Sequence, residues 1–341
     1  MLALVTGGFG FLGSYVCEAL SLAGWEFMVI DSLTYAAVNE CFVIRLPGYR
    51  PESSGDVADP ATWQWFDKPH WRPDAVFHLA AETHVDRSLG LDPTTLTPLR
   101  EDPVERLYRT NVIGTVRAAE FARKVGARLI HWSTDEVYGD LTNDLGHRPT
   151  GIKMIREGCN PDDVIRRRDE DDALCPSSPY SASKAAAEMA VHASVRLGLH
   201  ATILRPSNAY GPRQARDKLI PVAVRKLARG EPVPLYDGGY QVRQWVHAED
   251  IARAALLAVD KKVDGAFNLG GPSLLRNTGL VQALAIGGRT SWSVVSVPDR
   301  PGHDVAYAVR SCRAERTLGW VPSRRIEEDA AELFAAYSKP A

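Results

Sequence analysis

The chain contains 341 residues, 45% of them hydrophobic, with a formal net charge of −2, which is ordinary for a globular protein and argues against nucleic-acid or anionic-membrane partners. No apolar run approaches the ~18 residues that cross a bilayer. The five cysteines are scattered without metal-ligand spacing, which favours a cytoplasmic location and argues against a metal site.

The first segment combines an apolar strand with a glycine-rich loop. Residues 2–5 run directly into Gly7, Gly10 and Gly13, and a helical pattern then continues to Leu22. Glycine permits a tight turn and lets the backbone and the helix amino terminus approach a pyrophosphate closely. The pattern predicts a dinucleotide-binding site, and a plain strand–turn–helix is the alternative.

A second predicted strand, residues 25–30, ends at Asp31. An acid at this position accepts hydrogen bonds from the adenosine ribose and repels a 2′-phosphate, so it favours NAD over NADP. Further along, Asp56 and Val57 either lie beside the adenine or form a turn.

Residues 74–81 form a third predicted strand, which runs into a polar stretch at 82–88, where a cofactor cleft would be lined. The proline-rich residues 89–103 predict an exposed excursion. A helix follows at 103–125. Within it, Asn111 is either solvated or, if it faces the sheet, in need of a polar partner.

The apolar residues 128–132 predict a buried parallel strand, and Thr134, Asp135 and Glu136 follow it closely. In open α/β sheets, chemistry takes place at the carboxyl ends of the strands. These residues are therefore candidates for an acid–base site, although polar residues after a strand often only cap the next helix.

An alanine-rich helical pattern begins at Tyr180, and Lys184, four residues later, shares its face. A phenol and an ammonium group that meet two carboxyl groups in one cleft would form an acid–base site, but Tyr-x-x-x-Lys alone is a common helix pair. The preceding residues, 140–172, are dense in charge and predict a loop or lid.

The remaining strands define the expected domains. Residues 201–205 and 266–270 predict further strands, and the proline-containing stretch after residue 205 is typical of a departure from the sheet. We expect an α/β fold with a doubly wound parallel sheet. A Rossmann-type NAD-binding domain would comprise residues 1–205 plus about 241–270, and a smaller C-terminal α/β substrate-binding lobe would comprise 206–240 and 271–341.

Taken together, these motifs resemble the extended short-chain dehydrogenase/reductases and, more narrowly, the dTDP-glucose 4,6-dehydratase family. The matches span nearly the whole chain. The glycine loop and the Tyr180/Lys184 pair specify only the superfamily, whereas residues 78–88 and Thr134-Asp135-Glu136 are far more specific.

The resemblance implies an NAD-dependent nucleotide-sugar 4,6-dehydratase that acts in deoxysugar biosynthesis. Tyr180, its phenol pKa lowered by Lys184 and by the nicotinamide charge, would take the proton of the 4-hydroxyl while carbon 4 is oxidised, with Thr134 placing the 4-oxygen. Glu136 would remove the proton on carbon 5, and Asp135, kept protonated by a raised pKa, would protonate the departing 6-hydroxyl. Hydride would then return to carbon 6.

The resemblance also implies the binding residues. NAD would contact Gly7, Gly10, Phe11, Leu12, Gly13, Asp31, Asp56, Val57, Leu79, Ala80, Ala81, Tyr180 and Lys184. The nucleotide-diphosphate sugar would contact His84, Ser88, Asn208, Arg243, Asn268, Arg300 and His303. A homodimer would form through the alanine-rich faces of the helices at 103–125 and 180–197, unless those faces belong to the intramolecular core.

Departures from the family pattern gather on the substrate side. Val305 and Ala306 stand where the family usually has arginines, Gln244 stands where Asp is common, and 89–103 and 140–172 also differ. The base and the sugar could therefore differ from those of dTDP-glucose. A nucleotide-sugar 4-epimerase or decarboxylase remains the alternative enzyme, and a catalytically silent NAD-binding regulatory protein is the alternative from another class.

Overall fold

The computed structural model describes residues 1–341 except 52–53, 69–71, 84–102, 142–164, 300–302 and 340–341. Its larger lobe is built on a six-stranded sheet in the order β2-β1-β3-β4-β5-β9, and every neighbouring pair is parallel. The strands are β1 (Leu2–Thr6), β2 (Glu26–Ile30), β3 (Ala75–His78), β4 (Arg128–Trp132), β5 (Ala201–Pro206) and β9 (Gly265–Leu269). The predicted doubly wound parallel sheet is confirmed.

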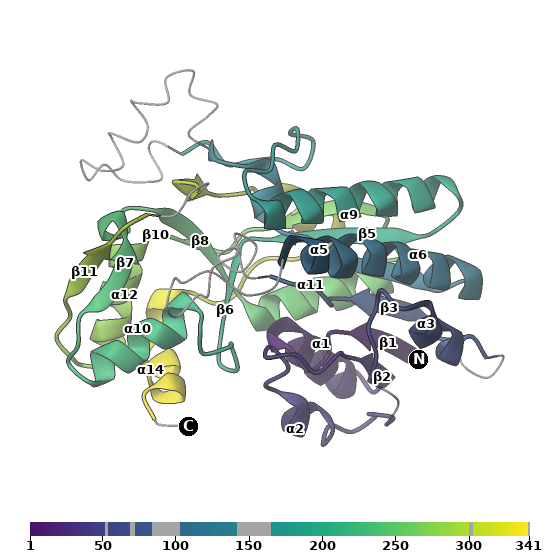
Figure 1. Ribbon diagram of the computed structural model, residues 1–341, viewed down its shortest axis with the longest axis horizontal. Helices are drawn as coiled ribbons and strands as arrows, with labels where there is room; N and C mark the ends of the chain where they lie inside the picture. The colour runs from purple at the N-terminus through teal and green to yellow at the C-terminus, as the bar shows by residue number, and fades with distance from the viewer. Residues whose placement is uncertain (52–53, 69–71, 84–102, 142–164, 300–302, 340–341) are drawn as a thin grey trace.

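Helices cover both faces of this sheet (Figure 1), because successive side chains of a strand point to opposite faces. In β1, Ala3 and Val5 join one apolar cluster, whereas Leu4 joins another. The first cluster includes residues of α1 (Phe11–Leu22), α11 (Ala248–Asp260) and α13 (Cys312–Leu318). The second includes residues of α3 (Pro60–Phe66), α6 (Gly114–Val125) and α9 (Pro179–Arg196).

The predicted helix at 103–125 is present but contains a local change of winding. It begins as α5 (Pro103–Tyr108), widens into the π-helical turn η1 (Arg109–Ile113) and continues as α6. Single π-helical turns of this kind often occur at functional sites. Here the turn carries Asn111, which is fully buried.

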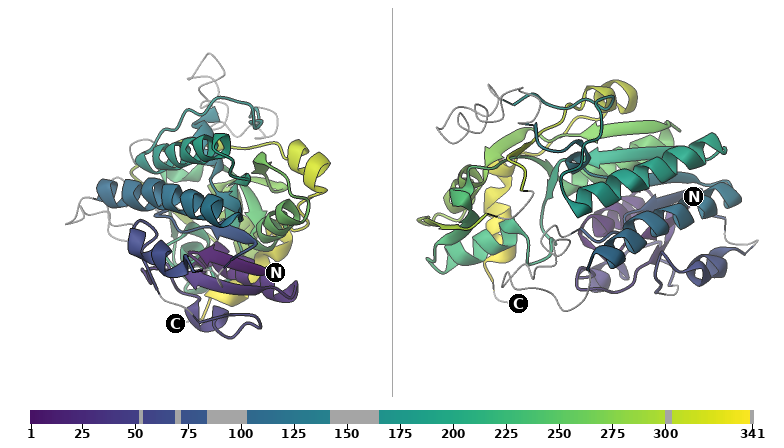
Figure 2. Two further views of the ribbon diagram at one scale, coloured as in Figure 1. Left: turned by 90° about the vertical axis from the view of Figure 1, so that its right-hand side faces the viewer. Right: turned by 45° about the horizontal axis from the view of Figure 1, so that its top comes forward.

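The smaller lobe holds a second sheet, in which β10, β8 and β12 are neighbours and β6 also pairs with β8. A separate pair of parallel strands, β7 and β11, belongs to the same lobe and is seen at the left of Figure 1. The elements are β6 (Asn208–Tyr210), α10 (Leu219–Ala228), β7 (Val233–Tyr236), β8 (Val242–His247), β10 (Ser273–Arg276), α12 (Asn277–Gly287), β11 (Val294–Val297), β12 (Ala306–Tyr307) and α14 (Ile326–Tyr337). Figure 2 (right) shows the two lobes side by side.

Two segments lie in the opposite lobe from the one expected. Residues 242–247 were assigned to the NAD-binding domain, but β8 is the central strand of the second sheet. Residues 312–320 were assigned to the smaller lobe, but Ala314, Leu318 and Trp320 pack into the core beneath α1 and α11. The reason is that strand pairing and packing between distant segments, rather than chain order, decide where each segment lies.

Two predicted excursions fall mainly outside the described residues: 89–103, of which only Pro103 is described, and 142–164 within 140–172. The described end of the second one, 165–172, enters the interior, where Arg168 and Glu170 are buried. Among the described helices, none combines the length and the hydropathy of a membrane span.

Candidate active site

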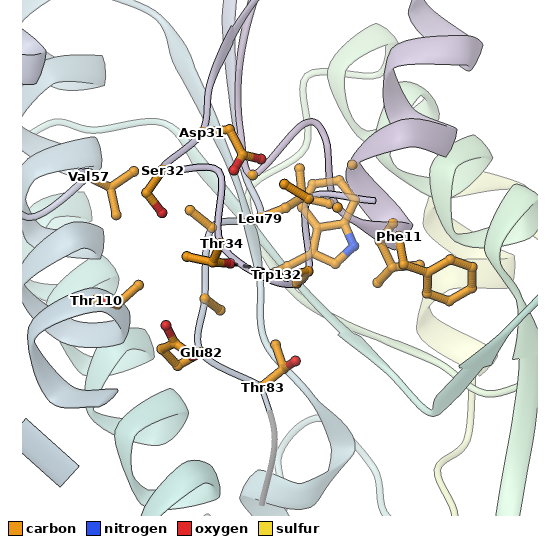
Figure 3. Close-up of a pocket in the computed structure, with 18 of the residues that line it drawn as sticks. Phe11, Asp31, Ser32, Thr34, Val57, Leu79, Glu82, Thr83, Thr110 and Trp132 are labelled. Carbon is orange, nitrogen blue, oxygen red and sulfur yellow. Dashed lines mark hydrogen bonds between the residues drawn. The ribbon is translucent and has the colours of Figure 1, made fainter. Parts of the chain in front are cut away.

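A cavity of about 680 Å³ opens at the carboxyl ends of the parallel strands (Figure 3). All the residues to which the sequence assigned NAD contacts line it: Gly7, Gly10, Phe11, Leu12, Gly13, Asp31, Asp56, Val57, Leu79, Ala80, Ala81, Tyr180 and Lys184. The topology explains this convergence, because parallel strands deliver the residues that follow them to the same edge of the sheet.

The glycine loop forms one end of the cavity. Gly7 has φ +69, a conformation that favours glycine, and a Cβ on Gly13 would lie 2.1 Å from the Gly7 carbonyl oxygen. The N-cap of α1 is Gly10, which has no side chain to pair with the first backbone N–H groups. These amides and the helix dipole therefore suit a phosphate group, so the loop fits the pyrophosphate of a dinucleotide.

Asp31 follows β2 and is held by the backbone on both sides. One carboxylate oxygen accepts a hydrogen bond from the Phe9 amide at 3.1 Å, and the other accepts one from the Leu33 amide at 2.9 Å. Burial raises the pKa of Asp31, and these two hydrogen bonds oppose the rise. The carboxyl group is thus fixed in place beside the cavity, where it fits the hydroxyls of an adenosine ribose.

Asp56 and Val57 lie in a turn before α3, one of the two alternatives that the sequence left open. One Asp56 oxygen accepts from the Ala58 amide at 2.8 Å, and the other accepts from the Arg109 guanidinium at 2.9 Å. This ion pair is exposed and ties the turn to η1 beside the cavity.

Tyr180 and Lys184 lie in the first turns of α9, where a capping box between Ser178 and Ser181 fixes the start of the helix and Pro179 occupies its first position. Both side chains are buried and line the cavity. Burial lowers the pKa of Lys184 to about 8, although the charge of Glu188 opposes this. The lysine can therefore lose its proton near neutral pH.

The expected lowering of the Tyr180 pKa by Lys184 and by the nicotinamide charge stays a prediction, and the protein's own groups act in the opposite direction. Burial raises the pKa of the phenol, the negative charges of Glu136 and Asp135 raise it further, and a hydrogen bond with Thr134 opposes the rise. The sequence placed these groups in one cleft but could not show how deeply the phenol is buried or that two carboxyl groups face it.

Thr134, Asp135 and Glu136 follow β4 and open the short helix η2 (Asp135–Tyr138). The Thr134 hydroxyl accepts from the Glu136 amide at 3.2 Å and lies 3.4 Å from an Asp135 oxygen. Burial, followed by the Glu136 carboxylate, raises the pKa of Asp135 to about 8, whereas Arg243 and the Thr134 hydrogen bond lower it. Glu136 is less buried than Asp135, so the two neighbouring acids occupy different environments.

Asn111 connects the cavity wall to the Tyr180 helix. Its side chain accepts from the Glu82 amide at 2.8 Å and donates to the Glu82 carbonyl at 3.0 Å and to the Ser183 hydroxyl at 2.9 Å. Ser183 in turn donates to the Tyr180 carbonyl at 2.7 Å. The sequence predicted that Asn111 would need polar partners if it faced the sheet. The residue is buried, and these hydrogen bonds supply the partners.

The residues expected to bind the substrate are not brought together in one cavity as the expected NAD contacts are. His84, Ser88 and Arg300 lie outside the described residues. Asn208 is half-buried at the start of β6, and His303 pairs with Asp299 at 2.6 Å. No described member of this set lines the cavity.

Arg243 is buried against the smaller lobe. Its guanidinium donates to the carbonyls of Val242 and Asp304 at 2.8 and 2.9 Å, contacts the Val305 carbonyl at 3.3 Å and lies 4.5 Å from the centre of the Tyr307 ring. Its expected pyrophosphate contact stays a prediction.

Asn268, an expected nucleotide contact, has protein partners in this structure. It is fully buried, and its side chain accepts from the Tyr138 hydroxyl at 2.8 Å and donates to the Arg168 carbonyl at 3.2 Å. Its backbone N–H donates to the Glu170 carboxylate at 2.9 Å. The residue therefore holds the segment 168–170 against the sheet, and its expected nucleotide contact stays a prediction.

Several residues that line the cavity were not singled out from the sequence as cofactor contacts: Ser32, Thr34, Thr83, Trp132, Ser133, Gln214 and Lys218. Lys218 arrives from the smaller lobe, just before α10, and nothing in the local pattern indicates that this loop returns to the sheet. The sequence pattern indicates that Trp132 is a core residue of a strand, and in the structure it belongs to the core as well as to the cavity wall. Among the described residues, no group of three or more His, Cys, Asp or Glu side chains is placed to hold a metal ion.

Comparison with known proteins agrees with this geometry. Residues 3–270 match the model of the NAD dependent epimerase/dehydratase family. The dTDP-glucose 4,6-dehydratase of Streptomyces griseus is 38% identical over 346 residues, covering 98% of this chain and 94% of that protein. The NAD-bound crystal structure of the Streptomyces venezuelae dTDP-glucose 4,6-dehydratase superposes with a TM-score of 0.80 at 32% identity, covering 99% and 97% of the two chains.

A UDP-glucose 4-epimerase is similar as well. The Thermotoga maritima enzyme has a TM-score of 0.80 and 28% identity, with 99% of this chain and 98% of that chain covered. The glycine loop, the acid after β2, the Tyr180/Lys184 pair and the full-length similarity agree with one another, and the chain therefore belongs to the NAD dependent epimerase/dehydratase family.

Proposed function

We propose that this protein is an NAD-dependent nucleotide-sugar 4,6-dehydratase, with dTDP-glucose as substrate and dTDP-4-keto-6-deoxyglucose as product. The observation that carries the proposal is the pair of neighbouring acids at the end of β4. Asp135 is buried with its pKa raised to about 8, and Glu136 beside it is less buried. Two carboxyl groups held in different environments suit a general acid and a general base that act on one substrate.

The first step is oxidation at carbon 4. Tyr180 takes the proton of the 4-hydroxyl, Lys184 lies one helical turn away, and Thr134 donates a hydrogen bond to the 4-oxygen. NAD, when bound in the cavity, supplies the acceptor for the carbon 4 hydride and later the donor that returns it to carbon 6. Because Asp135 is protonated near neutral pH, Glu136 is the neighbouring acid whose charge opposes formation of the Tyr180 phenolate, in addition to the burial of the phenol.

The second step is loss of water. A ketone at carbon 4 acidifies the proton on carbon 5, which Glu136 removes as general base. The bond between carbon 6 and its oxygen breaks as Asp135 protonates the departing hydroxyl, so that water leaves. After hydride reaches carbon 6, Glu136 returns its proton to carbon 5. In one turnover Tyr180 gains one proton and Asp135 loses one, and proton exchange with solvent restores both groups.

The test is incubation of the purified protein with dTDP-glucose followed by mass spectrometry. We expect a product with the mass of the substrate minus one water, which absorbs in alkali as a 4-keto sugar does. An unchanged mass with inverted carbon 4 would instead indicate a 4-epimerase. If no nucleotide sugar is turned over, the protein is a binding or regulatory protein.

We also propose that the protein is a homodimer. The contacting elements α5, η1 and α9 carry exposed apolar side chains: Val104, Tyr108, Ile113 and Met189. Pairing these helices between two copies would remove these side chains from water. We expect a dimer in sedimentation analysis of the wild type and a monomer for Met189→Glu, and a monomeric wild type would overturn this proposal.

We further propose a cytoplasmic location. The support comes from the cysteines that the structure describes, because Cys17, Cys41, Cys175 and Cys312 are free thiols among them, as is usual in a reducing compartment.

A further inference from the structure

Trp132 occupies a position that combines core packing with access to the cavity. It is the last residue of β4 and is 4% exposed. Its ring packs against Phe77, with 6.5 Å between the ring centroids. It also lines the cavity together with Tyr180 and Lys184, and Figure 3 shows it among the lining residues.

The indole nitrogen of Trp132 has no hydrogen-bond partner among the described residues. An indole N–H can only donate, and a buried donor without a partner is unfavourable. Most buried polar groups have partners, so this one calls for a physical explanation. A ligand that enters the cavity with an oxygen acceptor would provide it.

The order of the sheet indicates which part of a dinucleotide would meet Trp132. Asp31 follows β2, Trp132 ends β4, and β1 and β3 lie between them. Neighbouring strands lie about 4.8 Å apart, so the ends of β2 and β4 are separated by about 14 Å. With the adenosine ribose at Asp31, the nicotinamide half falls at the β4 end, beside Tyr180. Its oxygen acceptors are the carboxamide and the ribose hydroxyls.

We propose that Trp132 is a cofactor-positioning residue, whose indole N–H donates a hydrogen bond to an oxygen of the nicotinamide–ribose half of bound NAD. The indole nitrogen presents almost no surface to solvent in this structure, so the bond requires the ring to rotate toward the cavity. The inference rests on the cofactor in the proposed function and does not depend on the dehydration reaction.

The chain offers a matched control for the test. Trp245 is also 4% exposed, and its indole nitrogen likewise has no partner among the described residues. However, Trp245 lies in β8, in the core of the smaller lobe, and does not line the cavity. Trp245→Phe and Trp132→Phe therefore remove similar buried groups, of which only one faces the cofactor.

The experiment measures NADH binding rather than turnover. Each protein is freed of bound NAD and then equilibrated with NADH, and the cofactor emission sensitised by tryptophan excitation is titrated. Losing one hydrogen bond predicts that Trp132→Phe weakens binding about five- to tenfold and loses more sensitised emission than Trp245→Phe. We expect Trp245→Phe to bind NADH within about twofold of the wild type, because Trp245 does not line the cavity.

Three outcomes would overturn the inference: equal NADH affinity of Trp132→Phe and the wild type, an equal loss in Trp245→Phe, or no NADH binding by the wild type. If Trp132→Phe does not fold, Trp132→Leu is measured in the same way. Tight NADH binding together with absent dehydratase activity would overturn the proposed function and leave this inference standing.

Discussion

Replacing Asp135 with asparagine tests two consequences of burying this acid: a pH-dependent cost to stability and a proton that is available for catalysis. Burial and the Glu136 carboxylate raise the pKa of Asp135 from 3.8 to about 8. At pH 7 the folded protein therefore retains a proton that the unfolded chain has released. An acid whose folded pKa is raised destabilises the fold increasingly as the pH rises from its unfolded pKa to its folded pKa. Asparagine has no titrating proton, so Asp135→Asn removes this dependence.

The size of the effect follows from the same values. Each pH unit between the two pKa values contributes about 1.36 kcal/mol. Between pH 5 and pH 7, the free energy of unfolding of Asp135→Asn should therefore rise by about 3 kcal/mol relative to the wild type. A constant offset of about 1–3 kcal/mol can accompany it, because an Asp135 oxygen has no partner among the described residues and the new amide would be no better satisfied.

The assay is urea denaturation of both proteins at several pH values in this range, with Asp260→Asn as a control that alters an exposed carboxyl group. We expect a difference that grows with pH for Asp135→Asn and a flat one for the control. Dehydration should fall by about 10²–10⁴ in the same variant, because the general acid is lost. A pH-independent difference in stability would show that Asp135 is not held protonated by the fold, and the reasoning would fail.

Three further substitutions test other parts of the site. Glu136→Gln should still reduce NAD when substrate is added but should not release water, and full dehydratase activity would remove Glu136 as the base. Tyr180→Phe should slow oxidation at carbon 4 by about 10²–10⁴, measured as single-turnover NADH formation, and substantial activity would refute its role. Gly13→Ala places a Cβ 2.1 Å from the Gly7 oxygen and should abolish NAD retention on gel filtration, whereas normal retention would show that the loop can relax.

The sequence predicted those parts of the fold that depend on local pattern. The glycine spacing, the acid after β2 and the apolar run of β4 each lie within a few residues, and parallel strands bring their ends together by rule. The cavity is accordingly lined by the residues that these motifs indicated. The pairing of β8 with strands more than twenty residues away in sequence has no such local signal, which is why its lobe was misassigned.

The sequence was least informative where burial decides the chemistry. It identified Tyr180 but did not indicate that the protein's own groups raise the pKa of the phenol, because the depth of the phenol and its two carboxyl neighbours depend on tertiary packing. It gave no indication that Asn268 holds the segment 168–170 in the fold. Lys218 and Trp132 reach the cavity through loop direction and strand orientation, which composition and periodicity do not specify.

The most direct test of the central claim follows a single hydrogen through the reaction. The protein is incubated with dTDP-glucose that carries deuterium on carbon 4, and the product is analysed by NMR. Oxidation at carbon 4 followed by hydride return predicts deuterium on carbon 6 of a 4-keto-6-deoxy product. Deuterium that remains on carbon 4, or a product without deuterium at carbon 6, would contradict the account.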